Sequence, residues 1–354
     1  MSAALPPNMR AWRTHAWGEP GEALKLDRIA LPEPGPGELL VRNLAIPLNL
    51  NDMERVTGGN MMVTPELPLV PGMEVMGEVA ACGAGAEAWQ GRRVAAMTKV
   101  ASGGWAEFSI CPMSSSFDMP EDVPLPGAAA LLFPFHLAWL GLVDRAGLRE
   151  GESVLIHAAA GGAGSAAVQV AKHLGARVFA TAGSAEKCAL ARSLGADVVV
   201  DYSGNDFADV VLAETEGRGV DVVFDNVGAA VMERSLYCTA YGGRYLMMGF
   251  ASDKSKVDEP LVVPRRVAAG NLKLCGVLLA YAPDAMIPVM KKGMGWNFCP
   301  SALGAKITEE VVGWVREGSV KPVVGREVGF EEIPAEIEAL FRRRTTGRTI
   351  VRLD

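Results

Sequence analysis

The sequence predicts an α/β protein in which a doubly wound parallel sheet is joined to a compact, barrel-like β domain. Three observations support this prediction. A glycine-rich turn connects an apolar strand to a helix of small residues near residue 160. Strands then alternate with helical segments up to about residue 282. Before residue 125, short strands are separated by turns rich in glycine and proline, as in small β-barrels.

The segment 153–175 has the pattern of a buried strand, a tight turn and a helix that ends at Gly175. The turn has the spacing Ala158-x-x-Gly161-x-x-Gly164. Such a turn directs backbone N–H groups and the positive end of a helix dipole toward an anion, usually the pyrophosphate of a dinucleotide. The residues expected to face it are Ala160, Gly161, Gly162 and Ala163. Because the spacing departs from G-x-G-x-x-G, a tight turn without a ligand is the alternative.

The second strand of this unit, residues 177–181, bears on which dinucleotide binds. NAD-binding proteins normally carry an acidic residue near the end of this strand, where it binds the ribose 2′-hydroxyl. No carboxylate stands at that position here, and Ser184 and Lys187 follow instead. A hydroxyl group and a cation suit a 2′-phosphate, so the sequence favours NADP over NAD. Both residue types are also common at helix starts and on solvated faces, which is the alternative interpretation.

Three further strands are predicted at 221–224, 244–248 and 272–277. Polar or glycine-containing turns follow the first two of them. Ligands of an open α/β sheet bind beyond the carboxyl ends of its strands. The residues expected to contact the cofactor there are Asn226, Gly249, Phe250, Ala251 and Val277.

Composition argues against several classes of protein. The 354 residues suit two domains, and a content of 49% hydrophobic and 21% charged residues is ordinary for a globular protein. A formal net charge of −7 argues against a nucleic-acid partner, because phosphate binding needs clustered cations. Apolar runs are shorter than the ~18–20 residues of a membrane span, and the first residues lack the pattern of a secretory signal. We therefore expect a cytoplasmic protein.

The cysteines and histidines do not form a metal-binding pattern. The six cysteines are scattered without a C-x-x-C pair, so free thiols in a reducing cytoplasm are expected. The four histidines are dispersed as well. His157, on the first strand of the glycine-rich unit, and His173, on the following helix, are predicted to be structural.

The two ends of the chain contain the remaining predicted elements. Strands are expected at 39–42, 75–79, 93–97 and 106–110, and helical structure at 125–146. The tail is expected to form a helix at 308–317, a strand at 323–328, a helix at 333–343 and a strand at 349–352.

Several short motifs along the chain together resemble one family. They are Pro32–Glu38, Pro71–Glu74, Ala158–Lys172, Leu194–Asp197, Gly217–Asp221, Asp225–Gly228 and Gly242–Arg244. Over nearly its full length the chain is similar to the zinc-independent medium-chain dehydrogenases/reductases of the quinone oxidoreductase, or zeta-crystallin-like, group. The resemblance implies a GroES-like β-barrel catalytic domain formed by residues 1–128 and 286–354 around a Rossmann NADP-binding domain at 129–285.

The resemblance also implies roles for single residues. Asn49 matches an asparagine near the nicotinamide, and Asp52 matches the acid three residues later. Lys187 and Tyr202 match residues that bind the adenosine 2′-phosphate, and Arg343 matches a third such contact in some members. The alternatives are a turn asparagine for Asn49, a loop aromatic for Tyr202 and a solvated helix-end cation for Arg343.

Departures from the family pattern concern the metal and the substrate. The cysteine of zinc-dependent relatives is missing from residues 48–52, and Met73–Glu74 replaces their His–Glu pair, so no zinc is expected. Leu137 stands where a threonine is usual. Glu54 and Asn60 stand where quinone reductases often carry tyrosines.

The reaction that the resemblance implies is metal-free hydride transfer from NADPH to a quinone-type acceptor. Without a metal the protein cannot strongly polarise an alcohol, but it can position a reduced nicotinamide against an acceptor that already stabilises negative charge. One alternative is NADPH-dependent reduction of the double bond of an enone, an enal or an enoyl thioester. Another is a nucleotide-binding structural protein without turnover.

The last strand of the sheet, residues 272–277, suggests a partner. It would form an edge with apolar residues at Leu272, Leu274 and Val277, and an open apolar edge is a liability unless it is covered. The resemblance suggests that this strand pairs with its symmetry mate in a homodimer. The alternative is an edge covered by residues 291–300, an insert without a clear counterpart in the family.

Overall fold

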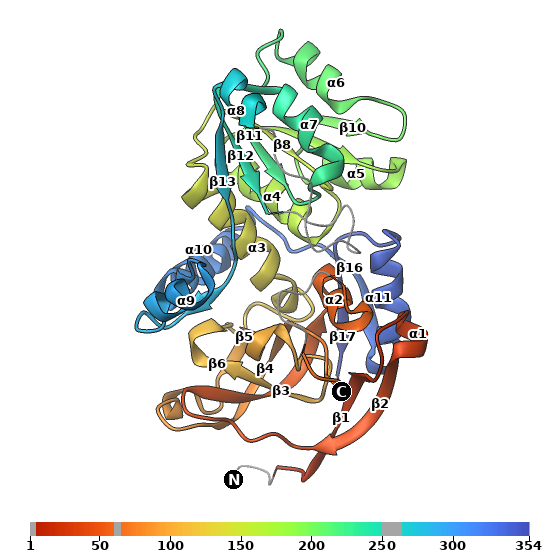
Figure 1. The fold of residues 1–354 in the computed structure, drawn as a ribbon, viewed down its shortest axis with the longest axis vertical. Coiled ribbons are helices and arrows are strands. Elements are labelled where there is room, and N and C mark those ends of the chain that lie inside the picture. Colours follow the sequence, from red (N-terminus) through yellow and green to blue (C-terminus); the bar gives the residue numbers. More distant parts are fainter. Residues whose placement is uncertain (1–4, 60–64, 249–263, 354) are drawn as a thin grey trace. The chain divides into compact units, whose positions relative to one another are not determined.

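The structure is a computed structural model that describes residues 5–59, 65–248 and 264–353. The chain divides into two compact units. The first unit comprises Met1–Leu132, Ala280–Val312 and Val324–Asp354, and the second comprises Phe133–Leu279 and Gly313–Val323. The second unit is thus inserted into the first, which contains both ends of the chain (Figure 1).

The described part of the second unit is built on a six-stranded sheet in which all neighbours are parallel. Its strands are β8 Ser153–Ile156, β9 Arg177–Ala182, β10 Val198–Asp201, β11 Val220–Asp225, β12 Thr239–Met247 and β13 Lys273–Gly276. Their order is β10-β9-β8-β11-β12-β13 (Figure 1). The order reverses between β8 and β11, and open sheets bind ligands at such a switch point. The predicted doubly wound sheet is confirmed.

Apolar sequence explains these strands. A parallel sheet covered on both faces needs nearly continuous hydrophobic strands, and every residue of β8 is buried. The core of the unit includes Leu155, Phe179, Val223 and Tyr245. The helices of this unit are α4 Gly162–His173, α5 Ala185–Ser193, α6 Phe207–Glu214, α7 Ala229–Tyr237 and α8 Pro264–Gly270. Before the sheet, α3 Leu132–Trp139 continues into a π-helical turn at Leu140–Arg145.

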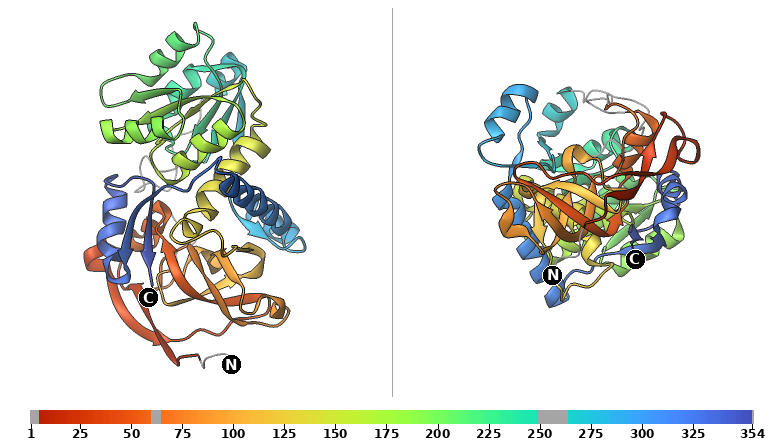
Figure 2. Two further views of the ribbon diagram at one scale, coloured as in Figure 1. Left: turned by 180° about the vertical axis from the view of Figure 1, so that it is seen from behind. Right: turned by 90° about the horizontal axis from the view of Figure 1, so that it is seen from below.

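The described part of the first unit contains a seven-stranded sheet. Its strands are β3 Glu38–Pro47, β4 Glu74–Cys82, β5 Arg93–Met97, β6 Phe108–Pro112, β7 Ser116–Asp118, β16 Val324–Gly329 and β17 Arg348–Arg352. The order is β16-β17-β3-β4-β5-β7, and β6 also pairs with β3. Because β17 lies antiparallel to β3, strands from both ends of the chain lie side by side in this unit (Figures 1 and 2).

Smaller elements complete the first unit. Strands β1 Asn8–Thr14 and β2 Leu24–Ala30 form a separate antiparallel pair, and β14 Tyr281–Ala282 pairs with β15 Cys299–Pro300. The helices are α1 Pro20–Ala23, α2 Glu54–Thr57, α9 Ile287–Met294 and α11 Ile333–Phe341, and α10 Ser301–Glu317 passes from the first unit into the second. The insert at 291–300 thus forms the end of α9 and β15. None of the helices in the described ranges is long and apolar enough to cross a bilayer.

Candidate active site

The turn between β8 and α4 has the features of an anion site. Gly161 precedes the helix, no side chain caps its backbone donors there, and the first turn carries no acid. The first backbone N–H groups of a helix lack partners within it, so this end can bind an anion. A Cβ at Gly164 would lie 2.2 Å from the carbonyl oxygen of Ala158, so only glycine allows the helix to approach the strand this closely.

His157 follows β8 and has a structural role, as the sequence predicts. Its Nδ1 lies 3.0 Å from Thr181 Oγ1, and its Nε2 lies 2.7 Å from Ser235 Oγ. The Ser235 hydroxyl donates to the carbonyl oxygen of Val231, so His157 Nε2 must carry the proton in this contact. Burial lowers the pKa of His157 to about 3, which keeps the imidazole neutral.

The turn after β9 brings together three residues that the sequence assigns to the 2′-phosphate. Ser184 precedes α5, where its Oγ accepts a hydrogen bond from the backbone N–H of Lys187 at 3.3 Å. Tyr202, which is 49% exposed, lies against the same turn, because a Cβ at Gly183 would be 2.5 Å from its hydroxyl oxygen. Ser184 therefore caps the N-terminus of α5.

The turn after β11 contains a buried acceptor without a partner among the described residues. This acceptor is Asn226 Oδ1. The preceding Asp225 is satisfied, because its Oδ1 accepts from the N–H groups of Val227 and Gly228 and its Oδ2 from the hydroxyl of Tyr245. Buried polar atoms are normally hydrogen-bonded, so Asn226 has an unused capacity that a ligand could satisfy.

The remaining cofactor residues lie beyond β12 and β13. Gly249, Phe250 and Ala251 fall outside the described residues. Val277 follows β13 and is half-buried, and its N–H donates to the carbonyl oxygen of Met247 at 3.1 Å. Val277 therefore extends the hydrogen bonding between β12 and β13 by one residue at their carboxyl ends.

The residues that the sequence predicts as catalytic, Asn49 and Asp52, lie just after β3 in the first unit and are buried. The backbone N–H of Asn49 donates to Asp52 Oδ2 at 2.9 Å. The N–H of Met73 donates to Asp52 Oδ1 at 3.0 Å. Asp52 therefore ties the segment after β3 to the beginning of β4.

Burial determines the protonation of Asp52. Removal of the carboxylate from water raises its pKa from 3.8 to about 7. The two N–H donors and the cations of Arg55 and Arg348 act in the opposite direction and only partly compensate. Asp52 thus changes its charge close to neutral pH.

The side chain of Asn49 is held by two charged residues that the sequence analysis did not select as site residues. Asn49 Oδ1 accepts from Arg348 Nη1 at 2.7 Å, and Asn49 Nδ2 lies 3.1 Å from Glu74 Oε2. Arg348 Nη2 donates to the same Glu74 oxygen at 2.5 Å. Glu74 belongs to the motif Pro71–Glu74, which could have pointed to it as a site residue. Arg348 stands 299 positions from Asn49 and belongs to no sequence motif that could have pointed to it.

Arg343 lies in the first unit, two residues after the end of α11. Its backbone has a φ of 57°, and its N–H donates to the carbonyl oxygen of Leu340, as at many helix C-termini. The predicted site residues thus occur in two groups. Asn49, Asp52 and Arg343 belong to the first unit, and the other predicted nucleotide contacts belong to the second.

The position of the ligand pair in zinc-dependent relatives is held here by hydrogen-bonded side chains. No group of three or more His, Cys, Asp or Glu side chains suited to a metal ion occurs in the described part of the chain. Glu74, at the position of the metal-dependent relatives' ligand pair, is engaged by Arg348 and Asn49. The six cysteines are free thiols.

A parallel sheet with a glycine-rich first turn, inserted into a β unit made from both chain ends, defines a class of two-domain oxidoreductases. The Alcohol dehydrogenase GroES-like domain family matches residues 35–121, and the Zinc-binding dehydrogenase family matches residues 162–294. The first match lies in the first unit and the second largely in the inserted unit. The β-rich unit therefore has the GroES-like fold and the inserted unit the Rossmann fold.

Whole-length relatives identify the family. A quinone oxidoreductase from Pseudomonas aeruginosa is 33% identical over 338 residues, which cover 95% of this chain and 97% of the relative. Prostaglandin reductase-3 from Bos taurus is 31% identical over 340 residues, which cover 94% and 86%. A mycobacterial protein solved in complex with NADPH superposes with a TM-score of 0.81 at 32% identity over 98% of this chain and 100% of that one. The chain belongs to the medium-chain dehydrogenase/reductase family, in its zinc-independent quinone oxidoreductase group, and is an oxidoreductase.

Proposed function

We propose that this protein is an NADPH-dependent quinone oxidoreductase. The observation that carries the proposal is the turn after β9, which contains Ser184 and leads to Lys187 where NAD-binding proteins carry an acid, with Tyr202, from the end of β10, lying against Gly183. A cation and two hydroxyl groups suit a 2′-phosphate, whereas a carboxylate would repel it. The relative solved with NADPH supports the same cofactor.

The described residues fit such a dinucleotide at several points. The uncapped first turn of α4, at Gly161, Gly162 and Ala163 after Ala160, would hold the pyrophosphate. The unpartnered oxygen of Asn226 offers an acceptor beyond β11. Val277 would contribute from the end of β13. Gly249–Ala251 stay predicted contacts because of their place after a strand of the sheet, and Arg343 stays one on the strength of the family resemblance.

When bound, NADPH supplies a hydride from nicotinamide C4, and the acceptor takes this hydride and a proton to become a hydroquinone. Asn49 would present its oriented amide near the reacting groups, and Asp52 would hold the segment that carries Asn49. Because a quinone stabilises the negative charge that it gains, no metal is required to polarise it. The proton can come from water.

A second candidate is reduction of the conjugated double bond of an enone, an enal or an enoyl thioester. The relative named prostaglandin reductase-3, at 31% identity over most of both chains, favours it. The two reactions require the same hydride geometry and differ in the pocket that receives the acceptor. Leu137, Glu54 and Asn60 depart from the quinone reductase pattern in that region of the sequence.

One spectrophotometric experiment separates these functions. The loss of NADPH absorbance is followed with a panel of quinones and a matched panel of enones, enals and enoyl thioesters. Turnover of quinones supports the proposal, and turnover of double-bond substrates alone supports the second candidate. Tight NADPH binding without turnover of any acceptor would indicate a nucleotide-binding structural protein and refute both.

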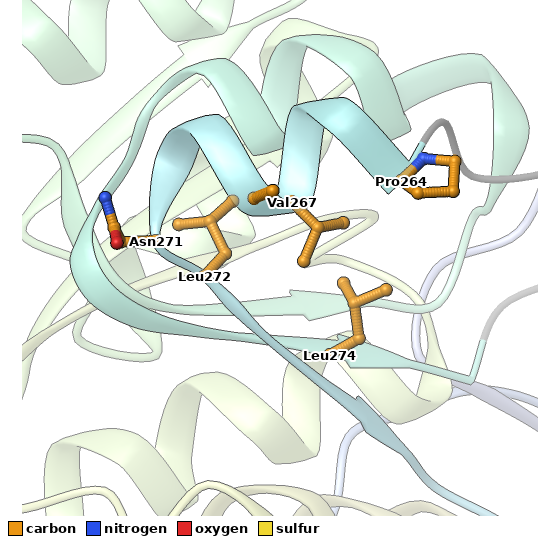
Figure 3. Close-up of a pocket in the computed structure, with 6 residues that line it drawn as sticks. Pro264, Val267, Asn271, Leu272 and Leu274 are labelled. Carbon is orange, nitrogen blue, oxygen red and sulfur yellow. The ribbon is translucent and has the colours of Figure 1, made fainter.

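We further propose that the protein is a cytoplasmic homodimer that associates through β13. Within the described residues, β13 pairs with β12 alone. Beside it lies a shallow hollow of about 470 Å³ between α8 and β13, lined by Pro264, Val267, Ala268, Asn271, Leu272 and Leu274. Figure 3 shows Val267, Leu272 and Leu274 facing this hollow. A second copy of the strand would pair with this edge and cover its apolar side chains.

The cytoplasmic location is supported by the free thiols, which suit a reducing compartment.

A further inference from the structure

The Asn49 side chain belongs to a buried polar network drawn from three distant segments. Asn49 follows β3, Glu74 begins β4 and Arg348 begins β17. The side chains of Arg348 and Glu74 are 6% and 1% exposed. One guanidinium group reaches both acceptors, because Nη1 donates to Asn49 Oδ1 and Nη2 donates to Glu74 Oε2. All three segments belong to the first unit.

These partners allow the Asn49 amide only one orientation. A guanidinium group is a donor only and must face the amide oxygen. A carboxylate is an acceptor only and must face the amide nitrogen. If the amide turned over, its nitrogen would meet Arg348 and its oxygen would meet Glu74, and both contacts would become repulsive. The amide oxygen keeps a second lone pair, and the remaining N–H has only a long contact of 3.3 Å, to the carbonyl oxygen of Pro47.

The backbone of the same residue is fixed independently. Asp52 accepts the N–H group of Asn49 and that of Met73, the residue before Glu74. The position and the orientation of Asn49 are therefore set by different groups. A buried ion pair adds little net stability compared with apolar residues of similar size. The pair of Arg348 and Glu74 is therefore better explained by its orienting of the Asn49 amide than by a contribution to stability.

We infer that Arg348 is a positioning residue, which acts on hydride transfer by fixing the Asn49 amide with the help of Glu74. The inference rests on the proposed function, because it requires a reaction in which Asn49 takes part. Arg348 would touch neither the cofactor nor the acceptor. Its effect would be lost when Asn49 has no amide to orient.

A double-mutant cycle tests this inference on the full-length protein. Arg348→Met should lower kcat by about 100-fold, the effect of a reacting group displaced by about 1 Å, with KM for NADPH changed by no more than about three-fold. In an Asn49→Ala background, the same substitution should lower kcat by no more than about three-fold. With NADPH deuterated at the transferred position, the isotope effect on kcat should rise in Arg348→Met, since hydride transfer becomes slower.

Two further variants keep the test decisive. Arg348→Lys retains the charge but not the two-pronged geometry, so it should restore thermal stability more than kcat. If Arg348→Met does not fold, this variant and Glu74→Gln are measured instead. Arg352→Met is the matched control, because Arg352 lies on the same strand and pairs with Glu327 at the surface, with side chains 41% and 45% exposed. It should leave kcat unchanged.

The outcomes are distinguishable. A lower melting temperature with wild-type kcat in Arg348→Met, or in Arg348→Lys if the first variant is unfolded, would overturn the inference in favour of a structural role. Full loss of kcat in both the wild-type and the Asn49→Ala background would overturn it as well. If the wild-type protein reduces no acceptor, the proposed function fails first, and the inference fails with it.

Discussion

Asp52→Asn should remove a pH dependence of stability that the wild-type protein owes to one buried carboxyl group. Burial raises the pKa of Asp52 from 3.8 to about 7, so the folded state holds this proton more tightly than the unfolded state. Between about pH 4 and pH 7 the folded protein therefore carries a proton that the unfolded chain has released. The free energy of unfolding must fall as the pH rises through this window.

The pKa values give the magnitude of the effect. A rise from 3.8 to about 7 corresponds to a loss of about 4 kcal/mol between the acidic and the alkaline end of the window. An asparagine cannot titrate, so the variant lacks this loss. The substitution has its own cost of about 1–3 kcal/mol at acidic pH, because the amide NH2 group replaces one of the two carboxyl oxygens that accept the N–H groups of Asn49 and Met73, and one of these donors is left facing another donor. The free energy of unfolding of Asp52→Asn should therefore be lower than that of the wild type at acidic pH, and this difference should shrink or reverse as the pH rises.

Urea unfolding of both proteins at intervals from pH 5 to about pH 8.5 measures this difference, because titrations of other groups cancel between them. Asp118→Asn controls for the substitution itself, since that carboxylate is exposed and pairs with Arg92 at the surface. If the stability curves of wild type and Asp52→Asn run parallel across the whole range, Asp52 does not titrate near neutral pH and the reasoning is refuted.

Three other predictions follow from the site and the sheet edge. Lys187→Ala should raise the dissociation constant of NADPH about ten-fold or more, since a charge-assisted contact contributes ~1.5–3 kcal/mol, and should leave NADH affinity nearly unchanged; equal weakening of both would contradict the 2′-phosphate assignment. Dialysis against a strong chelator should change neither turnover nor melting temperature, and stoichiometric zinc lost together with activity would overturn the metal-free site. Light scattering should find a dimer that Leu274→Pro dissociates, because proline removes a ladder donor, whereas a wild-type particle of 37.4 kDa would contradict the dimer.

The sheet strands could be predicted because their burial requires runs of apolar residues. The predicted and observed bounds of an element differ where a glycine is needed for close packing. β12 begins at Thr239, whereas the sequence predicts a strand from 244, because the pair Gly242–Gly243 has the composition of a turn. A Cβ at Gly243 would lie 2.5 Å from the Thr239 side chain, so glycine allows the irregular pairing there. In α10, predicted from 308, the helix begins at Ser301, and a Cβ at Gly304 would lie 2.3 Å from the Phe117 ring. Low helix propensity at Gly304 concealed the first turns, and only the three-dimensional contact explains it.

The two groups of predicted site residues differ in how sequence encodes them. The phosphate-binding features are local, because a turn, a helix start and a strand end lie within a few residues of each other, as Gly161 and Ser184 illustrate. The environment of Asn49 is non-local, because Arg348 reaches it only after β17 has paired with β3. A substitution at Arg348 could therefore alter the reaction while every local motif of the family stays intact. Family motifs alone would assign such a variant the full activity of its relatives, whereas the network around Asn49 predicts cofactor binding with impaired hydride transfer.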